Sequence, residues 1–560
     1  MNFAKGALHD VQVLGLGQFK PAIEKRLRIW ENDDFARRFW SKDPTLWFPK
    51  PQPEIANRMG WLDMFEPMHN HLKAMIDLAE GIRSEGIRHV LLLGMGGSSL
   101  APEVYQHTFG AIDDHPRLLV LDSTHPDAVR SIESRIDIKK TVFIVSSKSG
   151  TTTETLSFFY YFWSRMSQAT PTPGRHFIAI TDPGTPLAHL AQERNFRKVF
   201  DGPPEVGGRY SALTFFGMVP AYLIGIDGHQ MLDRGWDMAE ASAGYLPESE
   251  NQALHLGAAI GELALAGKDK VTFFATPSLA SFPSWIEQLI AESTGKDGKG
   301  IVPIVDEVIE EPWAYRKDRV FVHYSLNSEM SAELNHGVKA LEGAGHPVIH
   351  LSLNNKYDLG QEIFRWEMAV AAAGSILGIH PFDQPDVQLA KELAKIAMEQ
   401  KVPRGAKLDK GESETIMVDH RIVASKALDA FIGNARLGDY IAVQAYLAPD
   451  DDKEAALQEF RLALRDRLKL ATTFGWGPRF LHSTGQLHKG GPHTGLFIQI
   501  IDEPSEDLAV PETNYTFGTL IQAQALGDFR ALKQRGRRVL RINLGHDTLK
   551  GLELLFDLLK

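Results

Sequence analysis

The chain of 560 residues contains no cysteine. This absence excludes disulfides, thiolate metal ligands and cysteine nucleophiles, and it fits a reducing compartment. The sequence also lacks an excess of positive charge, because 71 acidic side chains against 60 lysines and arginines give a formal net charge of −11. Binding to a nucleic-acid backbone requires the opposite balance, so nucleic acid is not the expected partner.

Long apolar runs are missing as well. The stretches FFGMVPAYLIGI and MAVAAAGSILGI are shorter than the roughly 20 residues that a helix needs to cross a bilayer. The N-terminal sequence MNFAKGALHD has no basic region followed by an apolar one, the pattern of a secretory signal. We therefore expect a cytoplasmic protein that spans no membrane, with an ordinary composition of 43% hydrophobic and 23% charged residues.

Short apolar runs alternate with longer amphipathic segments from residue 88 onward, a pattern typical of parallel α/β sheets. The runs are RHVLLLG, RLLVLDS, TVFIVSS, HFIAITD and KVFDG, then KVTFFAT, GIVPIVD, RVFVHYSL and PVIHLSL, and finally DYIAVQAYL, GLFIQII and RVLRINL. We expect a helical segment at 1–85, α/β domains at 86–240 and 241–400, and a C-terminal α/β region at 401–560. The charged stretch 401–415 is the candidate linker.

One loop is unusually rich in hydroxyl groups. VSSKSGTTTETL, residues 145–156, lies between an apolar run and an aromatic segment. A helix that begins near Thr152 would leave its first N–H groups free, and these groups together with the helix dipole favour an anion. The expected phosphate-binding side chains are Ser147, Lys148, Ser149, Thr151 and Thr152; an ordinary helix cap is the alternative.

A second loop, in HVLLLGMGGSSLAPEVY at 89–105, combines glycines with hydroxyls. Gly97 allows close backbone approach and Ser98 offers a donor, although the spacing differs from the G-x-G-x-x-G of dinucleotide folds. Two such loops at the carboxyl ends of strands in one sheet would meet in one crevice, where open α/β sheets bind ligands.

Together, GMGGSSLAP and SSKSGTTTET resemble the paired sugar-phosphate loops of the sugar isomerase fold. EVGGRYSALTFFG (205–217), EQLIAESTGK (287–296) and FDQPDVQLAK (382–391) resemble signatures of the glucose-6-phosphate isomerase family. The chain is most similar to the isomerase half of bifunctional transaldolase/glucose-6-phosphate isomerase, which carries FLHSTGQLHKGG-like sequence, here at 480–491. The resemblance implies two sugar-isomerase-type parallel-sheet sandwich domains and an additional C-terminal α/β region.

The resemblance also implies an aldose–ketose isomerase that acts on glucose 6-phosphate and fructose 6-phosphate through a cis-enediol, without a cofactor. Glu292 maps onto the family's catalytic base, and Lys391 onto the lysine of the last signature. Arg209, after two glycines, can stabilise the enediolate without a metal. The substrate-contacting glutamines are Gln288 and Gln384. The family forms dimers, so a homodimer is possible here.

Departures from the family pattern include Asp386 and Gln388, where glycine and glutamate are usual, and SKSGTTTET in place of SKTFTTQET. The family's G-T-N-G-Q-H segment, which carries the ring-opening histidine, is absent between Glu292 and Lys391. We therefore predict that His488, in the glycine-rich STGQLHKGGPHTG, opens the sugar ring. His336 and Lys391 are the alternatives, as is a loop that only packs the third domain.

The same residues leave other functions open. An isomerase of mannose 6-phosphate or of a 6-sulfo sugar would use the same fold, and so would a non-catalytic sugar-phosphate sensor, although a sensor needs no base. The 21 histidines show no H-E-x-x-H or similar spacing. In HNH at 69–71 the intervening residue turns the two rings apart on a helix, so no metal ligands are expected.

Overall fold

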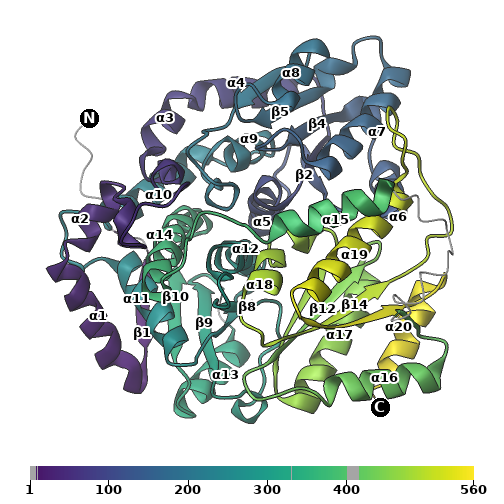
Figure 1. The fold of residues 1–560 in the computed structure, drawn as a ribbon. Coiled ribbons are helices and arrows are strands. Elements are labelled where there is room, and N and C mark those ends of the chain that lie inside the picture. Colours follow the sequence, from purple (N-terminus) through teal and green to yellow (C-terminus); the bar gives the residue numbers. More distant parts are fainter. Residues whose placement is uncertain (1–7, 9, 330, 400–414, 560) are drawn as a thin grey trace.

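The computed structural model describes residues 8, 10–329, 331–399 and 415–559, which form three five-stranded sheets flanked by helices (Figure 1). The expected α/β class with parallel-sheet domains is confirmed. No described helix combines the length and the apolar character that crossing a bilayer requires.

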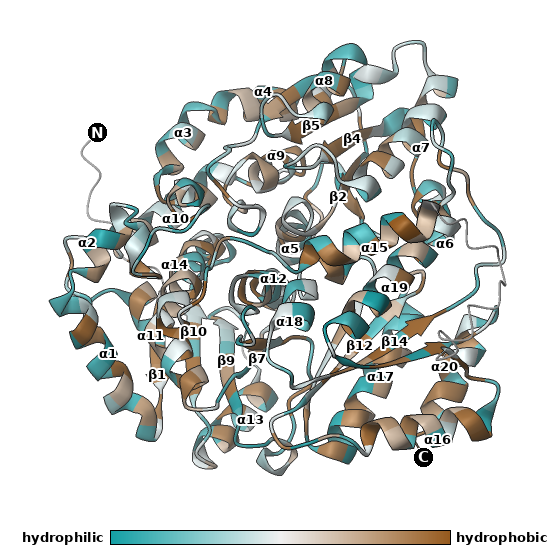
Figure 2. Ribbon diagram, in the orientation of Figure 1, coloured by the Kyte–Doolittle hydropathy of each residue, from teal (hydrophilic) through white to brown (hydrophobic). Residues whose placement is uncertain are grey.

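The first sheet is entirely parallel and has the strand order β3-β2-β4-β5-β6. Its strands are β2 (His89–Gly94), β3 (Arg117–Leu121), β4 (Thr141–Ser146), β5 (Phe177–Thr181) and β6 (Lys198–Asp201). Every residue of β4 is buried, and β4 and β5 are mostly brown in Figure 2, as expected for strands covered on both faces. The covering helices are α5 (Leu100–Phe109), α6 (Pro126–Ser134), α7 (Thr153–Ala169) and α8 (Pro186–Glu193).

The order of this sheet reverses between β2 and β4. Gly94 at the end of β2 pairs with Ser146 at the end of β4, while the chain runs from β2 outward to β3 before it returns to β4. The loops that follow these two strands therefore leave the same edge side by side. This is the topological switch point, where a ligand crevice forms.

The second sheet has the order β1-β10-β9-β7-β8. It contains β1 (Asp10–Gly15), β7 (Lys270–Ala275), β8 (Val302–Ile304), β9 (Arg319–Leu326) and β10 (Val348–Leu353). The segment 1–85 is thus not purely helical, because β1 pairs antiparallel with β10 as an edge strand. The helices that follow 240 are α11 (Gln252–Leu265), α12 (Phe282–Thr294), α13 (Ala332–Gly343) and α14 (Leu359–Leu377).

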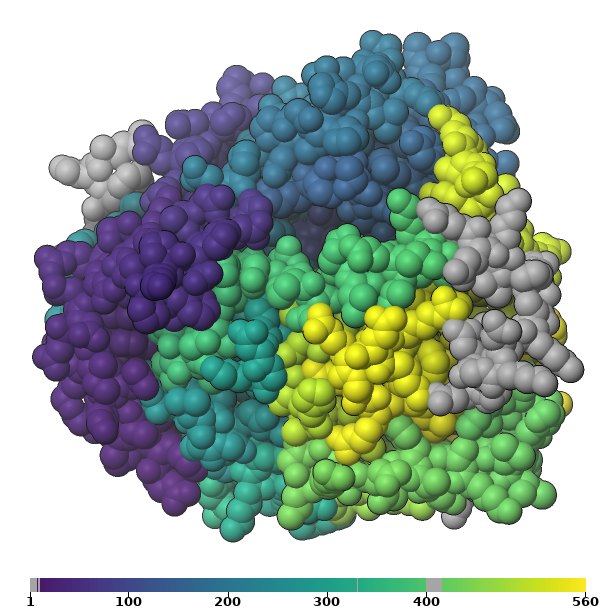
Figure 3. Space-filling model, viewed as in Figure 1, coloured from purple at the N-terminus to yellow at the C-terminus, as the bar shows by residue number. Residues whose placement is uncertain are grey.

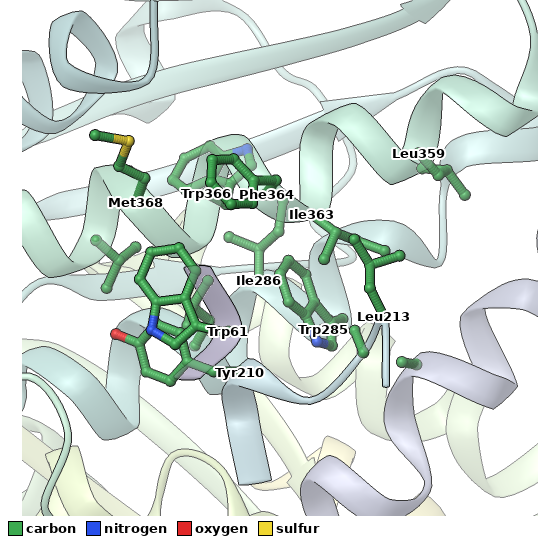
Figure 4. Packing of buried hydrophobic residues seen from close by; sticks show 14 of the residues in the cluster. Trp61, Tyr210, Leu213, Trp285, Ile286, Leu359, Ile363, Phe364, Trp366 and Met368 are labelled. Carbon is green, nitrogen blue, oxygen red and sulfur yellow. The ribbon is translucent and has the colours of Figure 1, made fainter. Parts of the chain in front are cut away.

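One hydrophobic core joins the N-terminal helices to the first two sheets. Trp61 stacks on Tyr210 with ring centroids 5.4 Å apart and contacts Phe364 of α14 edge-on at 5.5 Å (Figure 4). The helices of this region are α1 (Lys20–Asn32), α2 (Phe35–Trp40), α3 (Phe65–Asn70), α4 (Leu72–Ser84), α9 (Phe215–Leu223) and α10 (Gly228–Glu240). Continuous packing of this kind fixes the loops at its rim.

The third sheet is parallel, with the order β11-β15-β14-β12-β13. Its strands are β11 (Thr415–Met417), β12 (Tyr440–Tyr446), β13 (Ala471–Trp476), β14 (Gly495–Ile501) and β15 (Arg538–Asn543). Its helices are α16 (Arg421–Ile432), α17 (Asp451–Leu468), α18 (Gly485–Gly490), α19 (Phe517–Gln534) and α20 (Thr548–Asp557). Of the candidate linker, 401–414 lie outside the described residues and Thr415 begins β11.

This C-terminal domain packs against the other two. Ala291 of α12 and the strand β8 share an apolar cluster with Leu487 and Phe497. The buried carboxylate of Glu307 lies 3.3 Å from Arg319 of β9 and 3.6 Å from Arg465 of α17. Because breaking a buried ion pair leaves an uncompensated charge, this contact holds the domains in one arrangement. Figure 3 shows the yellow C-terminal surface against teal and green surfaces, and a hollow between a green segment and the blue surface of the first domain.

Candidate active site

The glycine-rich loop after β2 contacts two other segments of the site. Gly97 lies in the 3-10 turn η5 (Gly96–Ser98), and a Cβ placed on it would be 2.1 Å from the carbonyl oxygen of Gly208. Gly96 has a φ of +55°, and its Cβ would lie 2.6 Å from the carbonyl oxygen of His482. Both positions therefore require glycine, the first for space and the second also for its backbone conformation.

Glu292, the predicted base, and Arg209 face each other. Nη1 of Arg209 lies 3.5 Å from Oε1 of Glu292, and both side chains are nearly enclosed. Glu292 is in the last turn of α12 and Arg209 is in the 3-10 turn η8 (Gly208–Tyr210). The pair comes from two separate domains, and it provides a carboxylate and a fixed cation at one point.

Four further contacts hold the guanidinium of Arg209. Its Nε donates to Ser293 Oγ at 2.7 Å, and Nη2 donates to the carbonyl oxygens of Pro381 and Asp383. Its Nη1 donates to Oε1 of Gln384 at 3.1 Å. Gln384, predicted to contact the substrate, thus lies beside the Arg209–Glu292 pair on the loop before α15 (Val387–Glu399).

Lys296 is a buried group that sequence reasoning did not single out, although it ends the ESTGK motif. Its Nζ lies 2.8 Å from Oδ1 of Asp383 and donates to the carbonyl oxygen of His380. Burial, assisted by the positive charge of Arg209, lowers the pKa of Lys296 to about 7. Lys296 therefore anchors the loop that holds Arg209.

The hydroxyl-rich loop leads into α7 without capping the helix. Thr152 precedes α7 without capping it, because its Oγ1 contacts Ser147 Oγ at 2.9 Å. Ser149 and Thr151 contact each other at 3.0 Å and are exposed. The first turn of α7 thus has no side-chain cap, and hydroxyls lie around it, an arrangement suited to an anion.

The side chain of Lys148 forms an ion pair, unlike the neighbouring hydroxyl side chains. Its Nζ lies 2.6 Å from Asp182 and 3.0 Å from the carbonyl oxygen of Pro203. Burial lowers the pKa of Lys148, while Asp182 opposes that effect. The structure gives this lysine a partner on the far side of the loop, so a direct contact with substrate stays a prediction.

Gln288 connects the second domain to the C-terminal domain. Its Nε2 donates to Oε2 of Glu292 at 3.1 Å and to the carbonyl oxygen of His482 at 2.8 Å. Its Oε1 is buried and has no hydrogen-bond partner among the described residues. A buried unpaired acceptor beside Glu292 is the feature that a substrate hydroxyl would satisfy.

His482 is the histidine that the structure brings to this site. It ends the 3-10 turn η12 (Arg479–His482), and its Nε2 lies 3.0 Å from Oε1 of Glu154 in the first turn of α7. Oε1 of Glu154 also accepts from Nε2 of Gln524 at 2.7 Å. Burial alone would raise the pKa of Glu154, but the contact with His482 keeps it below its usual range.

His488, predicted to open the ring, lies instead in the C-terminal core. Its ring packs against Phe497 and Phe480, and its Nδ1 contacts Nε2 of Gln444 at 3.1 Å. Burial holds the pKa of His488 well below its usual range, which makes it a poor proton donor. No signal in the FLHSTGQLHKGG segment distinguishes position 482 from 488; only the tertiary packing of the segment does.

Two remaining predicted residues are exposed on other helices, and the position of a family departure is also defined. Lys391 is exposed on α15, and its charge contributes to the low pKa of Glu154. His336 is exposed on α13. Asp386, one of the departures from the family pattern, accepts from Nε2 of Gln486 at 2.8 Å and pairs with Arg535. That departure therefore coincides with a contact to the C-terminal domain.

The sequence is similar to a known family and to known proteins. Residues 64–304 match the family model described as phosphoglucose isomerase. The chain is 28% identical over 381 residues to the glucose-6-phosphate isomerase of Rubrobacter xylanophilus, which spans 59% of this chain and 86% of that one. It is 29% identical over 409 residues to that of Heliobacterium modesticaldum, at 62% and 91% coverage.

Solved structures share the fold. A glucose-6-phosphate isomerase from Chlamydia trachomatis superposes with a TM-score of 0.59 at 18% identity, covering 72% of this chain and 91% of that one. A hypothetical protein from Thermus thermophilus gives 0.58 at 24% identity, covering 69% and 99%. These similarities leave a large part of the present chain without a counterpart.

Proposed function

We propose that this chain, whose residues 64–304 belong to the phosphoglucose isomerase family, interconverts glucose 6-phosphate and fructose 6-phosphate. The observation that carries the proposal is the enclosed pair of Glu292 and Arg209, with Oε1 and Nη1 3.5 Å apart. Aldose–ketose isomerisation needs one base that serves two adjacent carbons and one cation at the enediolate oxygens. The pair supplies both groups.

Glu292 takes the proton from C2 of the open-chain aldose and returns it to C1, and the proton of the C2 hydroxyl moves to the oxygen on C1, so that the carbonyl passes from C1 to C2. Arg209 stabilises the negative charge that develops on the enediolate oxygens, and its four other hydrogen bonds prevent it from moving away. The amide of Gln288 orients the carboxylate of Glu292 at 3.1 Å and presents its free oxygen to a sugar hydroxyl.

The phosphate is bound at the switch point of the first sheet. Gly97 and Ser98 lie after β2, and Ser147, Ser149, Thr151 and Thr152 lie after β4. Adjacent strand ends bring the two loops together, and the uncapped start of α7 favours an anion. With the phosphate bound there, the sugar extends toward Glu292.

His482 performs the ring opening in this scheme. Its Nε2–H donates to the carboxylate of Glu154 at 3.0 Å. A proton on Nδ1 passes to the ring oxygen as the C1–O5 bond breaks, while the C1 hydroxyl gives its proton to water and becomes the carbonyl group. The proton returns when the ring of the product closes. An imidazole suits this exchange because each of its two ring nitrogens can carry a proton.

The C-terminal domain thus contributes a catalytic group to a site built from the first two domains. His482 and Glu154 belong to the same chain, so a single copy holds every group that the scheme requires. A homodimer and a cytoplasmic location stay predictions from the sequence.

A coupled assay tests the function. Purified protein is incubated with fructose 6-phosphate, and glucose 6-phosphate is measured through its dehydrogenase. We expect faster turnover of fructose 6-phosphate than of mannose 6-phosphate or a 6-sulfonated glucose. Faster turnover of either competitor would reassign the substrate, and binding of fructose 6-phosphate without turnover would indicate a sensor.

A further inference from the structure

A cluster of three metal-ligating side chains lies away from the residues proposed for isomerisation. One nitrogen each of His69 and His229 and one carboxylate oxygen of Asp233 all lie within 4.8 Å of one another. Nε2 of His69 is 3.1 Å from Oδ1 of Asp233, and Nδ1 of His229 is 3.5 Å from Oδ2. These separations match those between ligands that share one metal ion at bond lengths of about 2.0–2.2 Å.

The hydrogen bonding of His69 fixes one of its ring protons. Its Nδ1 lies 2.7 Å from the carbonyl oxygen of Phe65, one turn earlier on α3. A carbonyl oxygen can only accept, so Nδ1 carries a proton. Nε2 then faces Asp233 either as a second N–H donor or as a lone pair with a cation between it and the carboxylate. An imidazole whose other nitrogen donates to a backbone carbonyl is the usual arrangement of a metal-binding histidine.

Helix α10 presents the other two ligands. His229 and Asp233 are four residues apart, so they lie on one face of the helix, one turn from each other. Asp227 caps this helix by accepting from the backbone N–H of His229 at 3.1 Å. The side chains of His229 and Asp233 are about half exposed, so an ion and its water ligands can reach them.

We propose that His69, His229 and Asp233 bind one divalent transition-metal ion, with zinc the favoured ion and water completing its coordination. Two imidazoles and a carboxylate are ligands that Zn²⁺ accepts, whereas Mg²⁺ and Ca²⁺ prefer oxygen donors. The ion would join α3, in the N-terminal segment, to α10. The site is independent of the proposed isomerase chemistry, because none of its residues takes part in that scheme.

His71 provides a matched control. It follows α3 and is exposed, and its Nδ1 contacts the carbonyl oxygen of Pro67 at 2.8 Å. It is two positions from His69 and is not one of the three residues whose ligand atoms lie together. If metal bound nonspecifically to surface histidines, replacing His71 would weaken binding as much as replacing His229.

The full chain, expressed without a polyhistidine tag and stripped with a chelator, is titrated with Co²⁺ and then competed with Zn²⁺. We expect one equivalent of Co²⁺ with visible d–d absorption, displacement by Zn²⁺, and a melting temperature that rises with Zn²⁺. His229→Ala and Asp233→Asn should each weaken Zn²⁺ binding at least tenfold, while His71→Ala leaves it unchanged.

The proposal is overturned if the wild type takes up no stoichiometric Co²⁺, in which case His69 and Asp233 form an ordinary ion pair. It is also overturned if His71→Ala loses as much affinity as His229→Ala. Melting of the stripped variants shows that each has folded. Stripped wild type should isomerise fructose 6-phosphate at the rate of the zinc-loaded protein, which keeps this test separate from that of the catalytic assignment.

Discussion

Nε2 of His482 lies 3.0 Å from Oε1 of Glu154, which joins the C-terminal domain to the first turn of α7. The same carboxylate oxygen accepts from Gln524 of α19, and Thr124 donates to the side-chain oxygen of Gln524 at 2.6 Å. This buried chain of hydrogen bonds fixes the imidazole beside Gln288 and the glycine-rich loop. It makes the C-terminal domain a structural part of the proposed active site.

Replacing His482 tests its role in ring opening. His482→Ala should slow turnover of closed-ring glucose 6-phosphate by about 10²–10⁴-fold, the usual contribution of general acid–base catalysis. Exchange of the C2 proton in an open-chain analogue should fall far less, because the base is intact. The two rates are measured by coupled assay and by isotope exchange.

His488→Gln is the comparison for that experiment, since His488 lies six residues later and packs inside the C-terminal core. We expect it to lower the melting temperature and to reduce both rates together. If His488→Gln instead affected only the closed-ring substrate, ring opening would belong to His488.

Glu292→Gln should abolish isomerisation while the protein still folds and binds sugar phosphate. The amide keeps the size of the side chain and its contact with Gln288, but it cannot accept the C2 proton. Turnover and binding of fructose 6-phosphate are measured on the same preparation. Turnover near the wild-type rate would remove Glu292 from the mechanism.

The double variant Ser147→Ala with Thr152→Ala should mainly raise KM. The two hydroxyls contact each other beside the uncapped start of α7, and each lost hydrogen bond to a charged phosphate costs about 1.5–3 kcal/mol. Ser134→Ala, on the exposed end of α6, is the control. An unchanged KM would mean that the hydroxyls only order the loop.

Most strands could be predicted from sequence, because buried parallel strands have continuous apolar runs. The positions of the two loops proposed to bind phosphate could also be predicted, because glycines and hydroxyl residues follow two of these runs. The pairing of Gly94 with Ser146 then brings the predicted loops together. Strands β1, β11 and β13 were missed. β11 has three residues, and β1 is an edge strand with exposed Val11 and Val13, so neither has a distinct apolar run.

The roles of individual C-terminal residues could not be predicted in the same way. His482 and His488 both lie in one glycine-rich segment, and only tertiary packing turns one toward Glu154 and the other toward Phe497. The cluster of His69, His229 and Asp233 was likewise invisible, because His69 is 164 residues from Asp233 in the chain and the three residues match no ligand-spacing motif.

Gly97→Ala should inactivate the protein, whereas Gly208→Ala should not. A Cβ on Gly97 would lie 2.1 Å from the carbonyl oxygen of Gly208, and neither backbone can move without shifting Arg209; a Cβ on Gly208 meets nothing within 4 Å. Turnover and melting temperature are compared for the two variants. Equal effects would show that the approach of the two loops does not position the arginine.

Glu287, the residue before Gln288 on α12, carries a buried carboxyl group. Its Oε1 is buried and has no hydrogen-bond partner among the described residues, and burial, with the nearby charge of Asp306, raises its pKa to about 8. The folded state therefore binds a proton that the unfolded state has released above about pH 4.5. The contribution of the protonated form to stability is lost as the pH rises through 8.

Glu287→Gln keeps the neutral form at every pH. The variant should melt at nearly the wild-type temperature at pH 5 and at a higher temperature at pH 9, and the difference should grow across the interval between about 4.5 and 8. Glu80→Gln, an exposed substitution on α4, should show no such trend. A constant difference between Glu287→Gln and wild type across this range would mean that Glu287 ionises alike in the folded and unfolded chains, and that water reaches its carboxylate in the folded state.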